Sequence, residues 1–508
     1  MPIASALSVW VALHGPVAVA AAPAAAEPTP PARVVAARDA VDWTAASAQA
    51  AEHLSAFLQV DTTNPPGGER AGAEWMAARL AAEGITAEIR DHGEGRASLI
   101  ARLPATGGAP TGPAAGNGLC LVSHLDVVTA EPSRWTHPPL SGAQVDGQVW
   151  GRGALDMKGM GVVELEVLLW LKRVGVPLQR DVVLLAVADE EVSGLGMQAI
   201  AADWASVGCS HAINEGGLGI DGALFPGQVL HAISVAEKGF AWVRVRAEGE
   251  PGHGSVAEPA VEAPARLLTA MSAIERRVRP RPVIDPALRV LLANAGRAQG
   301  GVARWVMQPP WLQDLVVRPK LLARPQTRAA ITNTTHLTGM AGARSPNVVP
   351  ASVEAVYDCR LLPGATPQDA LDTLARAVRG IPGITLTLID GRVSDRSPID
   401  DPVYRALATY AVEGRPGHVA GPVLSVGFTD SLFLRPLGVH AYGYIPFVVT
   451  VDEADTMHGD DERVSVVNLG EGTRRLLSVV VEVAGADAPL AAPPAAPPPP
   501  GDDGGAAH

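Results

Sequence analysis

The chain has 508 residues and a formal net charge of −13, and 47% of its residues are hydrophobic while 18% are charged. This length exceeds one ordinary core and predicts two domains with additional terminal segments, and the composition is typical of a globular protein. The negative charge argues against a nucleic-acid partner, because phosphate binding requires clustered lysine and arginine.

The two ends of the chain differ in composition from the rest. Residues 1–25 are apolar and end in alanine-rich sequence, which predicts a secretory signal peptide, although they contain no lysine or arginine. A membrane anchor or a low-complexity extension is the alternative, but Pro16 and the proline- and alanine-rich stretch at 22–31 argue against a stable membrane span. We therefore expect a secreted or periplasmic protein, with a cytoplasmic location as the alternative. Residues 26–44 are expected to form a flexible linker, and residues 485–508 a disordered tail rich in proline and alanine.

Helical and strand patterns alternate in the first half of the chain and predict an α/β domain. Residues 159–174 form a strong helical pattern that glycine and proline close. Residues 181–188 form a nearly unbroken apolar run, as expected for a strand buried on both faces of a sheet. This alternation predicts a central, mostly parallel sheet flanked by helices. The other elements expected before residue 233 are helices at 47–60 and 70–83 and strands at 97–103, 118–123 and 211–214.

The sequence pattern changes after residue 232. The elements expected from there follow the order β-α-β-β-α-β, which describes a ferredoxin-like module. An insertion at roughly 280–327, rich in tryptophan, proline and arginine, separates the first helix of this module from its second strand. We expect residues 45–232 and 392–484 to form one domain, with residues 233–391 inserted as a lid or dimerisation domain. The elements expected in the inserted domain are strands at 240–246, 331–340, 348–361 and 384–389 and helices at 260–278 and 367–379.

The three cysteines, Cys120, Cys209 and Cys359, are widely spaced and odd in number. They form no CxxC pair, so their spacing indicates neither a disulfide framework nor a thiolate zinc site. Cys120 lies in an apolar run, where we expect a buried structural thiol rather than a nucleophile.

Acidic residues and histidines stand at the ends of several predicted strands. In open α/β sheets the ligand site lies beyond the carboxyl ends of the strands, so we expect these side chains to meet there. A mixture of imidazole and carboxylate groups suits Zn²⁺, whereas Mg²⁺ rarely recruits two histidines. Each residue alone has an ordinary alternative as a structural or solvent-facing group, but their joint placement predicts a metal site. The residues are His124 and Asp126, Asp156 in a glycine-rich turn, Glu190 and Glu191, Glu215, and His458 late in the chain.

These motifs and their order make residues 45–484 similar to a family of di-zinc exopeptidases that includes carboxypeptidase G, aminoacylase, carnosine dipeptidase and succinyl-diaminopimelate desuccinylase. The resemblance implies two Zn²⁺ ions per chain, with Co²⁺ or Mn²⁺ as possible substitutes. It also implies that Asp126 orients His124 and that the peptide between Asp156 and Met157 is cis. The implied ligands are His124, Asp156 and Glu215 for one ion and Asp156, Glu191 and His458 for the other, with Asp156 as the bridge.

The same resemblance implies an amide hydrolase. Glu190 matches the family's general base, which takes a proton from a metal-activated water and passes it to the leaving nitrogen. The bond cleaved is expected to lie next to a free carboxylate, as in dipeptides, C-terminal residues and N-acyl amino acids.

His253, in the motif Gly-His-Gly-Ser at 252–255, matches a histidine that helps to stabilise the oxyanion in this family. In the family this histidine often acts across a dimer interface, so the resemblance implies a homodimer formed through the inserted domain. The alternative is an exposed histidine in a turn.

Four further residues match positions that lie near the substrate in the family. Asn347 and Arg360 correspond to substrate contacts, and the guanidinium of Arg360 is suited to bind a carboxylate through two hydrogen bonds. The alternative for Arg360 is a salt bridge to Asp358. Gly427 and Thr429 belong to a glycine-containing loop that matches the family's loop beside the substrate carboxylate.

The long insertion and the motifs at 427–431 and 457–463 look most like the carboxypeptidase S branch, which includes enzymes that hydrolyse or form N-acyl amino acids with fatty acyl chains. The apolar stretches at 302–311 and 315–322 either line an acyl pocket or form part of a lid or dimer surface. One alternative function is a cytoplasmic-type deacylase of a biosynthetic intermediate such as N-succinyl-diaminopimelate, which the expected signal peptide disfavours. Another is a catalytically silent binding protein of the same fold, which the presence of every expected ligand and of Glu190 disfavours.

Overall fold

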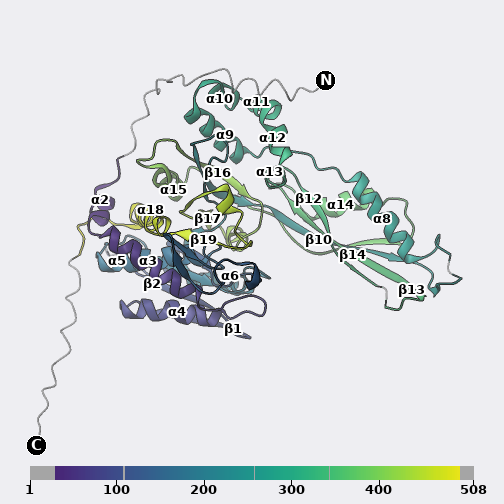
Figure 1. Cartoon of the computed structure of the whole chain (residues 1–508), viewed down its shortest axis with the longest axis horizontal. Coiled ribbons are helices and arrows are strands. Elements are labelled where there is room, and N and C mark those ends of the chain that lie inside the picture. The colour runs from purple at the N-terminus through teal and green to yellow at the C-terminus, as the bar shows by residue number, and fades with distance from the viewer. Residues whose placement is uncertain (1–28, 107–108, 257, 343, 492–508) are drawn as a thin grey trace, which may run out of the picture. The chain divides into compact units, whose positions relative to one another are not determined.

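The computed structural model describes residues 29–106, 109–256, 258–342 and 344–491 (Figure 1). All of its described helices and strands belong to the unit that begins at Pro31. The expected signal peptide and most of the expected C-terminal tail lie outside the described residues. The expectation of a flexible linker at 26–44 was wrong for its described part, because α2 (Ala32–Asp39) buries Val34 and Ala37 against the domain. Within these ranges, no helix has both the length and the apolar character needed to cross a membrane.

A ten-stranded mixed sheet forms the centre of the fold. The strands of its main path pair in the order β1 (Ala87–Gly93), β2 (Arg96–Leu103), β6 (Val182–Val187), β3 (Gly118–His124), β7 (Cys209–Asn214), β17 (His440–Gly443), β9 (Val229–Glu237), β8 (Gly219–Asp221) and β18 (Val448–Thr450), and β16 (His418–Ser425) pairs with β9. The middle strands β6, β3, β7 and β17 run parallel to one another. β3 and β6 are buried along their whole length, which explains the unbroken apolar sequence of β6 and the apolar run at 118–122 in β3. The predicted α/β fold with a mostly parallel sheet is thus confirmed.

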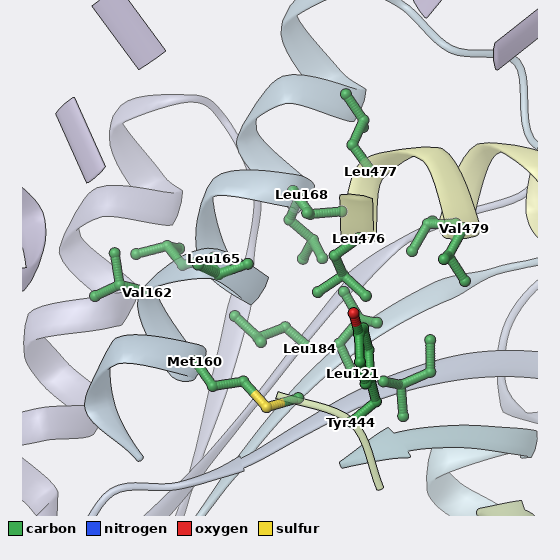
Figure 2. Packing of buried hydrophobic residues seen from close by; sticks show 14 of the residues in the cluster. Leu121, Met160, Val162, Leu165, Leu168, Leu184, Tyr444, Leu476, Leu477 and Val479 are labelled. Carbon is green, nitrogen blue, oxygen red and sulfur yellow. The ribbon is translucent and has the colours of Figure 1, made fainter. Parts of the chain in front are cut away.

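Helices cover both faces of this sheet. On one face α3 (Trp43–Leu58), α5 (Lys158–Arg173) and α18 (Val466–Ala484) pack together, and leucines of α5 and α18 meet Leu121 and Leu184 of the sheet (Figure 2). On the other face α6 (Leu195–Ala202) and α16 (Ser431–Leu434) pack against Val122 and Leu185. The smaller neighbouring elements are α2 (Ala32–Asp39), α4 (Glu69–Ala82), α7 (Trp204–Val207), α15 (Pro402–Val412), α17 (Val451–Ala454) and a three-stranded sheet of β4 (Ala143–Val145), β5 (Gln148–Trp150) and β19 (Arg463–Ser465).

The first long helix, α3, begins four residues before the position predicted from its apolar spacing. Asp42 caps it, because its carboxylate accepts hydrogen bonds from the backbone N–H groups of Thr44 and Ala45 at 3.0 and 3.1 Å. An aspartate at this position satisfies N–H groups that have no partner inside the helix. The apolar period alone does not register such a cap.

A separate antiparallel sheet has the order β12-β14-β10-β15. Its elements follow one another as β10 (Gly239–Glu248), α8 (Ala263–Arg277), β12 (Thr334–Ala341), β14 (Ser352–Leu361), α14 (Pro367–Val378) and β15 (Ile384–Arg392). This is the predicted β-α-β-β-α-β order, and α8 and α14 share a core with the sheet. The strand expected at 348–361 is divided in two, since β13 (Val348–Val349) leaves the sheet to pair with β11 (Gly252–His253) before β14 begins.

The insertion between α8 and β12 is helical. It contains α9 (Pro286–Gln299), α10 (Gly301–Val306), α11 (Pro310–Leu312), the π-helical η3 (Gln313–Val317), α12 (Arg318–Ala323) and α13 (Pro325–Ala330). Val317 and Leu321 belong to a small core of its own, whereas Trp305, Trp311 and Leu315 are exposed. The apolar side chains of this segment are thus divided between a core and the surface, which does not match an enclosed acyl pocket.

The expectation of a free thiol at Cys120 was wrong. Cys120 and Cys209 form a disulfide whose Cα atoms lie 5.8 Å apart, and both residues are buried. They lie on the neighbouring strands β3 and β7, where Gly118 pairs with Cys209. The two cysteines are 89 residues apart along the chain, so strand pairing brings them together and spacing does not reveal it. Cys359 is free and buried.

Candidate metal centre

The predicted metal ligands come from five separate segments that meet at one end of the central sheet. His124 is the last residue of β3, Glu191 follows β6 and Glu215 follows β7. These three strands are adjacent and parallel, so their carboxyl ends share one edge of the sheet. His458 arrives much later in the chain, in the turn after α17.

His124, Asp156 and Glu215 form a first cluster. His124 Nε2 lies 3.1 Å from Asp156 Oδ1 and 3.8 Å from Glu215 Oε1. The imidazole is buried, whereas the two carboxylates keep some exposure. One ligand atom from each residue therefore points to a common centre.

Asp156 belongs also to a second cluster, with Glu191 and His458. His458 Nε2 lies 3.0 Å from Asp156 Oδ2 and 3.3 Å from Glu191 Oε2. The two oxygens of Asp156 thus face two different histidines, as a bridging ligand requires. The His458 side chain is 51% exposed, so the centre opens to solvent on this side. The peptide between Asp156 and Met157 is cis, as expected.

Asp126 holds the loop that carries Glu190 and Glu191. Its carboxylate accepts the backbone N–H groups of these two residues at 3.1 and 3.0 Å. The Nδ1 atom of His124 lies 2.9 Å from the carbonyl oxygen of Asp126 and 3.5 Å from its Oδ1. A proton on Nδ1 is satisfied there, which leaves the lone pair of Nε2 directed at the cluster.

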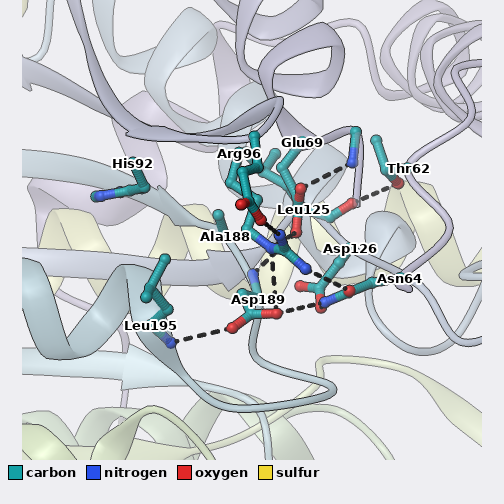
Figure 3. A network of polar contacts seen from close by, with 12 residues as sticks. Thr62, Asn64, Glu69, His92, Arg96, Leu125, Asp126, Ala188, Asp189 and Leu195 are labelled. Atoms are coloured by element: carbon teal, nitrogen blue, oxygen red, sulfur yellow. Dashed lines mark hydrogen bonds and ion pairs between the residues drawn. The ribbon is translucent and has the colours of Figure 1, made fainter. Parts of the chain in front are cut away.

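A buried polar network behind Asp126 was not predicted from the sequence (Figure 3). Asn64 donates to Asp126 at 2.9 Å and to Asp189 at 2.7 Å. Arg96 donates to the amide oxygen of Asn64 at 3.1 Å, and its Nε lies 3.4 Å from Asp189. Glu69 accepts the backbone N–H of Asp189 at 3.1 Å, which fixes this residue in a left-handed conformation with φ 65°. By holding Asp189, the network fixes the direction of the backbone that carries Glu190 and Glu191 after β6.

The role of Glu462 was also not predicted from the sequence. Its buried carboxylate accepts backbone N–H groups of the turn that carries Asp156, at 3.0 Å from Gly153, 2.7 Å from Leu155 and 3.0 Å from Asp156. It also pairs with Arg152 at 2.7 Å. Because Glu462 lies four residues after His458, this carboxylate links the two segments that meet in the second cluster.

The donor set fits divalent cations. Burial and the carboxylate of Glu215 raise the pKa of Glu190 well above its usual range, and burial and Asp156 act on the pKa of Glu215 in the same direction. Carboxylates crowded in this way require a nearby positive charge in order to ionise together. The Oε1 atom of Glu191 is buried and finds no hydrogen-bond partner among the described residues. Two imidazoles among these carboxylates form a ligand set of the kind that Zn²⁺ takes.

The structure places His253 and Asn347 beside each other but not beside this centre. His253 pairs with Val348 across the β11–β13 ladder, and the N–H of Gly254 donates to the carbonyl oxygen of Asn347 at 3.0 Å. The His253 side chain is exposed and contacts Ser255, with Nδ1 2.8 Å from the hydroxyl oxygen. In the described part of the chain, neither residue contacts a predicted metal ligand.

Arg360 forms a salt bridge to Asp358, which is the alternative to a substrate contact. Its Nε lies 3.0 Å from both carboxylate oxygens of Asp358. Its guanidinium also lies over the ring of Phe428, 4.9 Å from the ring centre, and Phe428 follows Gly427 in the predicted substrate loop. Arg360 is thus near that loop while it is paired with Asp358.

Thr429 anchors the same loop from inside. Its hydroxyl donates to the buried carboxylate of Glu237 and accepts from the Asn214 side chain at 3.3 Å, next to the predicted ligand Glu215. Asp430 follows, and its buried carboxylate has no hydrogen-bond partner in the described ranges. Burial raises the pKa of Asp430 to about 7, and His124 opposes that shift, so this carboxylate lies within the field of the first cluster. The sequence signal for Asp430 was its place in the matched loop.

The chain resembles known proteins over most of its length. The family described as peptidase family M20/M25/M40 matches residues 120–482. The human N-fatty-acyl-amino acid synthase/hydrolase PM20D1 is 30% identical over 358 residues, which cover 68% of this chain and 70% of the relative. Probable carboxypeptidase S-like 2 of Dictyostelium discoideum is 27% identical over 69% of this chain and 68% of its own. Aminoacylase-1 of Sus scrofa is 24% identical over 80% of this chain and 88% of its own.

Solved structures show the same fold. Human carnosine dipeptidase 1 has a TM-score of 0.60 at 18% identity, covering 89% of this chain and 99% of its own. The M20 family metallo-carboxypeptidase Sso-CP2 of Sulfolobus solfataricus also has a TM-score of 0.60 at 18% identity, covering 84% of this chain and 98% of its own.

Proposed function

The chain belongs to peptidase family M20/M25/M40, a family of metal-dependent hydrolases, and from this premise we propose that it cleaves an amide bond next to a free carboxylate. We propose N-acyl amino acids as the leading substrates, with dipeptides and C-terminal residues in the same chemical class. The observation that carries the proposal is the pair of clusters joined by Asp156, with Glu190 beside them. The relatives named as acting on N-fatty-acyl amino acids support the substrate class.

Two Zn²⁺ ions, one held by His124, Asp156 and Glu215 and the other by Asp156, Glu191 and His458, would supply Lewis acidity and lower the pKa of water to about 7. The protein's own side chains position a general base and bind the substrate around the reacting amide. Glu190 is the proposed base, because its backbone is fixed by Asp126 and it shares the centre without completing either cluster.

In the proposed reaction, Glu190 takes a proton from the attacking water as the new C–O bond forms at the carbonyl carbon. It then gives that proton to the amide nitrogen as the C–N bond breaks, so that the products are an amine and a carboxylic acid. Asp126 and Glu462 position other residues. Asp126 holds the backbone of Glu190, and Glu462 holds the backbone of Asp156.

We propose that Arg360 exchanges Asp358 for the substrate carboxylate. Both partners are carboxylates, and the guanidinium already stands over Phe428 in the loop that Thr429 anchors. A bidentate pair with a substrate carboxylate would favour substrates with a free acid.

A homodimer is proposed to complete the site with His253 and Asn347 of the second copy. These residues lie on an exposed ladder and contact no ligand of their own chain within the described ranges. The edge strand β12 of the same module is largely exposed, which leaves its backbone available to a partner.

A secreted or periplasmic location is the proposed setting. The disulfide between Cys120 and Cys209 supports it, because disulfides persist mainly in oxidising compartments. This setting counts against a cytoplasmic-type deacylase of a biosynthetic intermediate.

The test is hydrolysis of a substrate panel by the metal-loaded protein. The panel holds dipeptides and N-acetyl, N-succinyl and long-chain N-acyl amino acids, each paired with its carboxamide analogue. We expect turnover of the acids, the highest for a long acyl chain, and a loss of about tenfold or more for each carboxamide, as removal of one charged hydrogen-bond partner predicts. Equal rates for acids and carboxamides would contradict the proposal, and preference for N-succinyl-diaminopimelate would assign the alternative deacylase.

A further inference from the structure

The insertion between α8 and β12 is a run of helices (Figure 1), and several of its apolar side chains are exposed. Trp305 is 74% exposed, Trp311 64% and Leu315 66%. Val302 and Trp305 are three residues apart on α10, and Trp311 and Leu315 are four apart on the helical run that follows, so each pair shares one helix face. Of the tryptophans in the described part of the chain, only these two are exposed.

The packing of the insertion explains why these side chains point outward. Its inner faces already bury Leu292, Met307 and Leu321 in a small core. α9 is fastened to the central sheet, where Asn294 donates to the carbonyl oxygen of Ala420 at 3.0 Å. The exposed tryptophans are therefore left over after the insertion has satisfied its own core.

The charge of this segment is opposite to that of the whole chain. Residues 286–330 contain seven basic residues and one acidic residue, in a chain whose net charge is −13. The single acidic residue, Asp314, lies 3.0 Å from Arg289 and 3.8 Å from Arg318. The exposed residues Arg304, Lys320 and Arg324 have no ion-pair partner in the part of the chain that the structure describes.

We propose that this face, defined by Val302, Arg304, Trp305, Trp311, Leu315, Lys320 and Arg324, docks on the surface of an anionic lipid bilayer. Indole rings favour the boundary between headgroups and acyl chains, and valine and leucine side chains enter the acyl region. Arginine and lysine pair with anionic headgroups while their stems cover apolar surface.

Other occupants fit this face less well. A second copy of the chain would bring the same unpaired cations against one another, which opposes self-association through this face. A nucleic acid would satisfy the cations but would leave Val302 and Leu315 exposed. Of these three occupants, a bilayer of anionic lipid alone offers a partner to both kinds of side chain.

Docking through this face has a consequence for substrate supply, and this consequence alone rests on the proposed function. The insertion ends beside the residue that follows β9, where buried Lys238 donates to the carbonyl oxygens of Ala329 at 3.0 Å and Thr332 at 2.8 Å. Lys238 follows Glu237, which holds Thr429 of the substrate loop. A long-chain N-acyl amino acid partitions into bilayers, so docking would concentrate the enzyme where that substrate collects.

The test measures binding of the full, metal-loaded chain to vesicles without any substrate. Phosphatidylcholine vesicles with about 30% phosphatidylglycerol are compared with pure phosphatidylcholine vesicles by co-sedimentation, since the proposed attraction requires anionic lipid. We expect binding to the anionic vesicles only, weakened by salt. The double variant Trp305→Ala/Trp311→Ala and the triple variant Arg304→Glu/Lys320→Glu/Arg324→Glu should each lower the partition coefficient by roughly tenfold or more.

Matched controls carry the same kinds of change elsewhere. Val467, which is 71% exposed on α18, is replaced by serine, and Arg474 on the same helix is replaced by glutamate. Both controls should bind vesicles as the parent does. All variants should keep their metal content and their turnover of a short, water-soluble N-acetyl amino acid, which separates docking from folding and from catalysis.

The proposal is overturned if the parent chain does not bind anionic vesicles, or if the tryptophan variant binds as well as the controls. A change of oligomeric state in the tryptophan variant would assign the face to a second copy instead. Tight, salt-sensitive binding to nucleic acid without vesicle binding would assign it to that partner. None of these outcomes depends on which amide the enzyme hydrolyses.

Discussion

The central sheet and the inserted module place their motif residues in different ways. In the sheet, the adjacent parallel strands β3, β6 and β7 bring His124, Glu191 and Glu215 to one edge. In the module, His253 and Arg360 are held by near neighbours in the sequence and contact none of the predicted ligands in the described ranges. Strand pairing within one sheet therefore brings three of the five predicted ligands together, whereas Asp156 and His458 are placed by turns that Glu462 links, and the matched residues of the module stay apart from the ligands in the described ranges.

The strongest test of the sheet's part is the variant Glu190→Gln. We expect turnover to fall by about 10²–10⁴-fold, because an amide cannot take the proton, while the metal content stays unchanged. The turnover number and metal content are measured on the same sample. Glu88→Gln, an exposed change on β1, is the control and should leave turnover unchanged. If Glu190→Gln keeps its turnover, Glu190 is not the base.

The next largest effect is expected for the disulfide that joins two ligand-bearing strands. Replacing Cys120 and Cys209 by alanine should lower the free energy of unfolding by roughly 3–5 kcal/mol, since the loop between them is long. Denaturant titration measures the change. Cys359→Ala removes a free buried thiol from the inserted module and is the control for loss of a small side chain. Equal stability of the double variant and the parent would show that the cross-link does not hold the strands.

A variant of Arg360 tests whether the inserted module binds the substrate carboxylate. Arg360→Ala should raise KM by about 10–100-fold for substrates with a free carboxylate, as expected for loss of a charged hydrogen-bond pair, and change kcat less. Asp358→Asn frees the guanidinium and should not raise KM. Steady-state kinetics on an acid and its carboxamide separate the two. If both variants change only stability, the salt bridge to Asp358 is the whole role of Arg360.

A smaller effect is expected on the pH dependence of stability, through two histidines on β9 and β16. These strands flank the module in the sequence and pair in the central sheet. Burial and the charge of Arg475 lower the pKa of His231 to about 2, and burial and Arg415 lower that of its partner His418 to about 4. The unfolded chain takes up these protons below about pH 6.5 and the folded chain does not, so stability is lost as the pH falls.

His231 alone should account for a loss of about 2 kcal/mol between pH 7 and pH 5. His231→Gln removes the titration and should flatten the pH dependence by that amount, measured as denaturant unfolding at both pH values. His336→Gln, a change at an exposed histidine on β12, is the control. An unchanged slope in His231→Gln would show that His231 is protonated in the folded state.

The sequence allowed the prediction of features that depend on local pattern. The strands β3 and β6 and the helix α5 are each marked by apolar residues at a short, regular spacing. The candidate ligands then follow directly after the predicted strands. The disulfide, the network of Asn64, Arg96 and Asp189, and the role of Glu462 could not be predicted. Glu462 lies about 306 residues from the turn that it holds, and no local period reports on such a pairing. His253 and Arg360 were found by resemblance, which carries a role but not a position in space.

The measurement that tests the central claim most directly is the metal content of the purified chain and of Asp156→Ala, with turnover of an N-acyl amino acid on the same samples. We predict about two metal equivalents and turnover for the parent chain, and loss of both in the variant, because Asp156 serves both clusters. Turnover without bound metal, or an Asp156→Ala variant that retains two equivalents and full activity, would contradict the account.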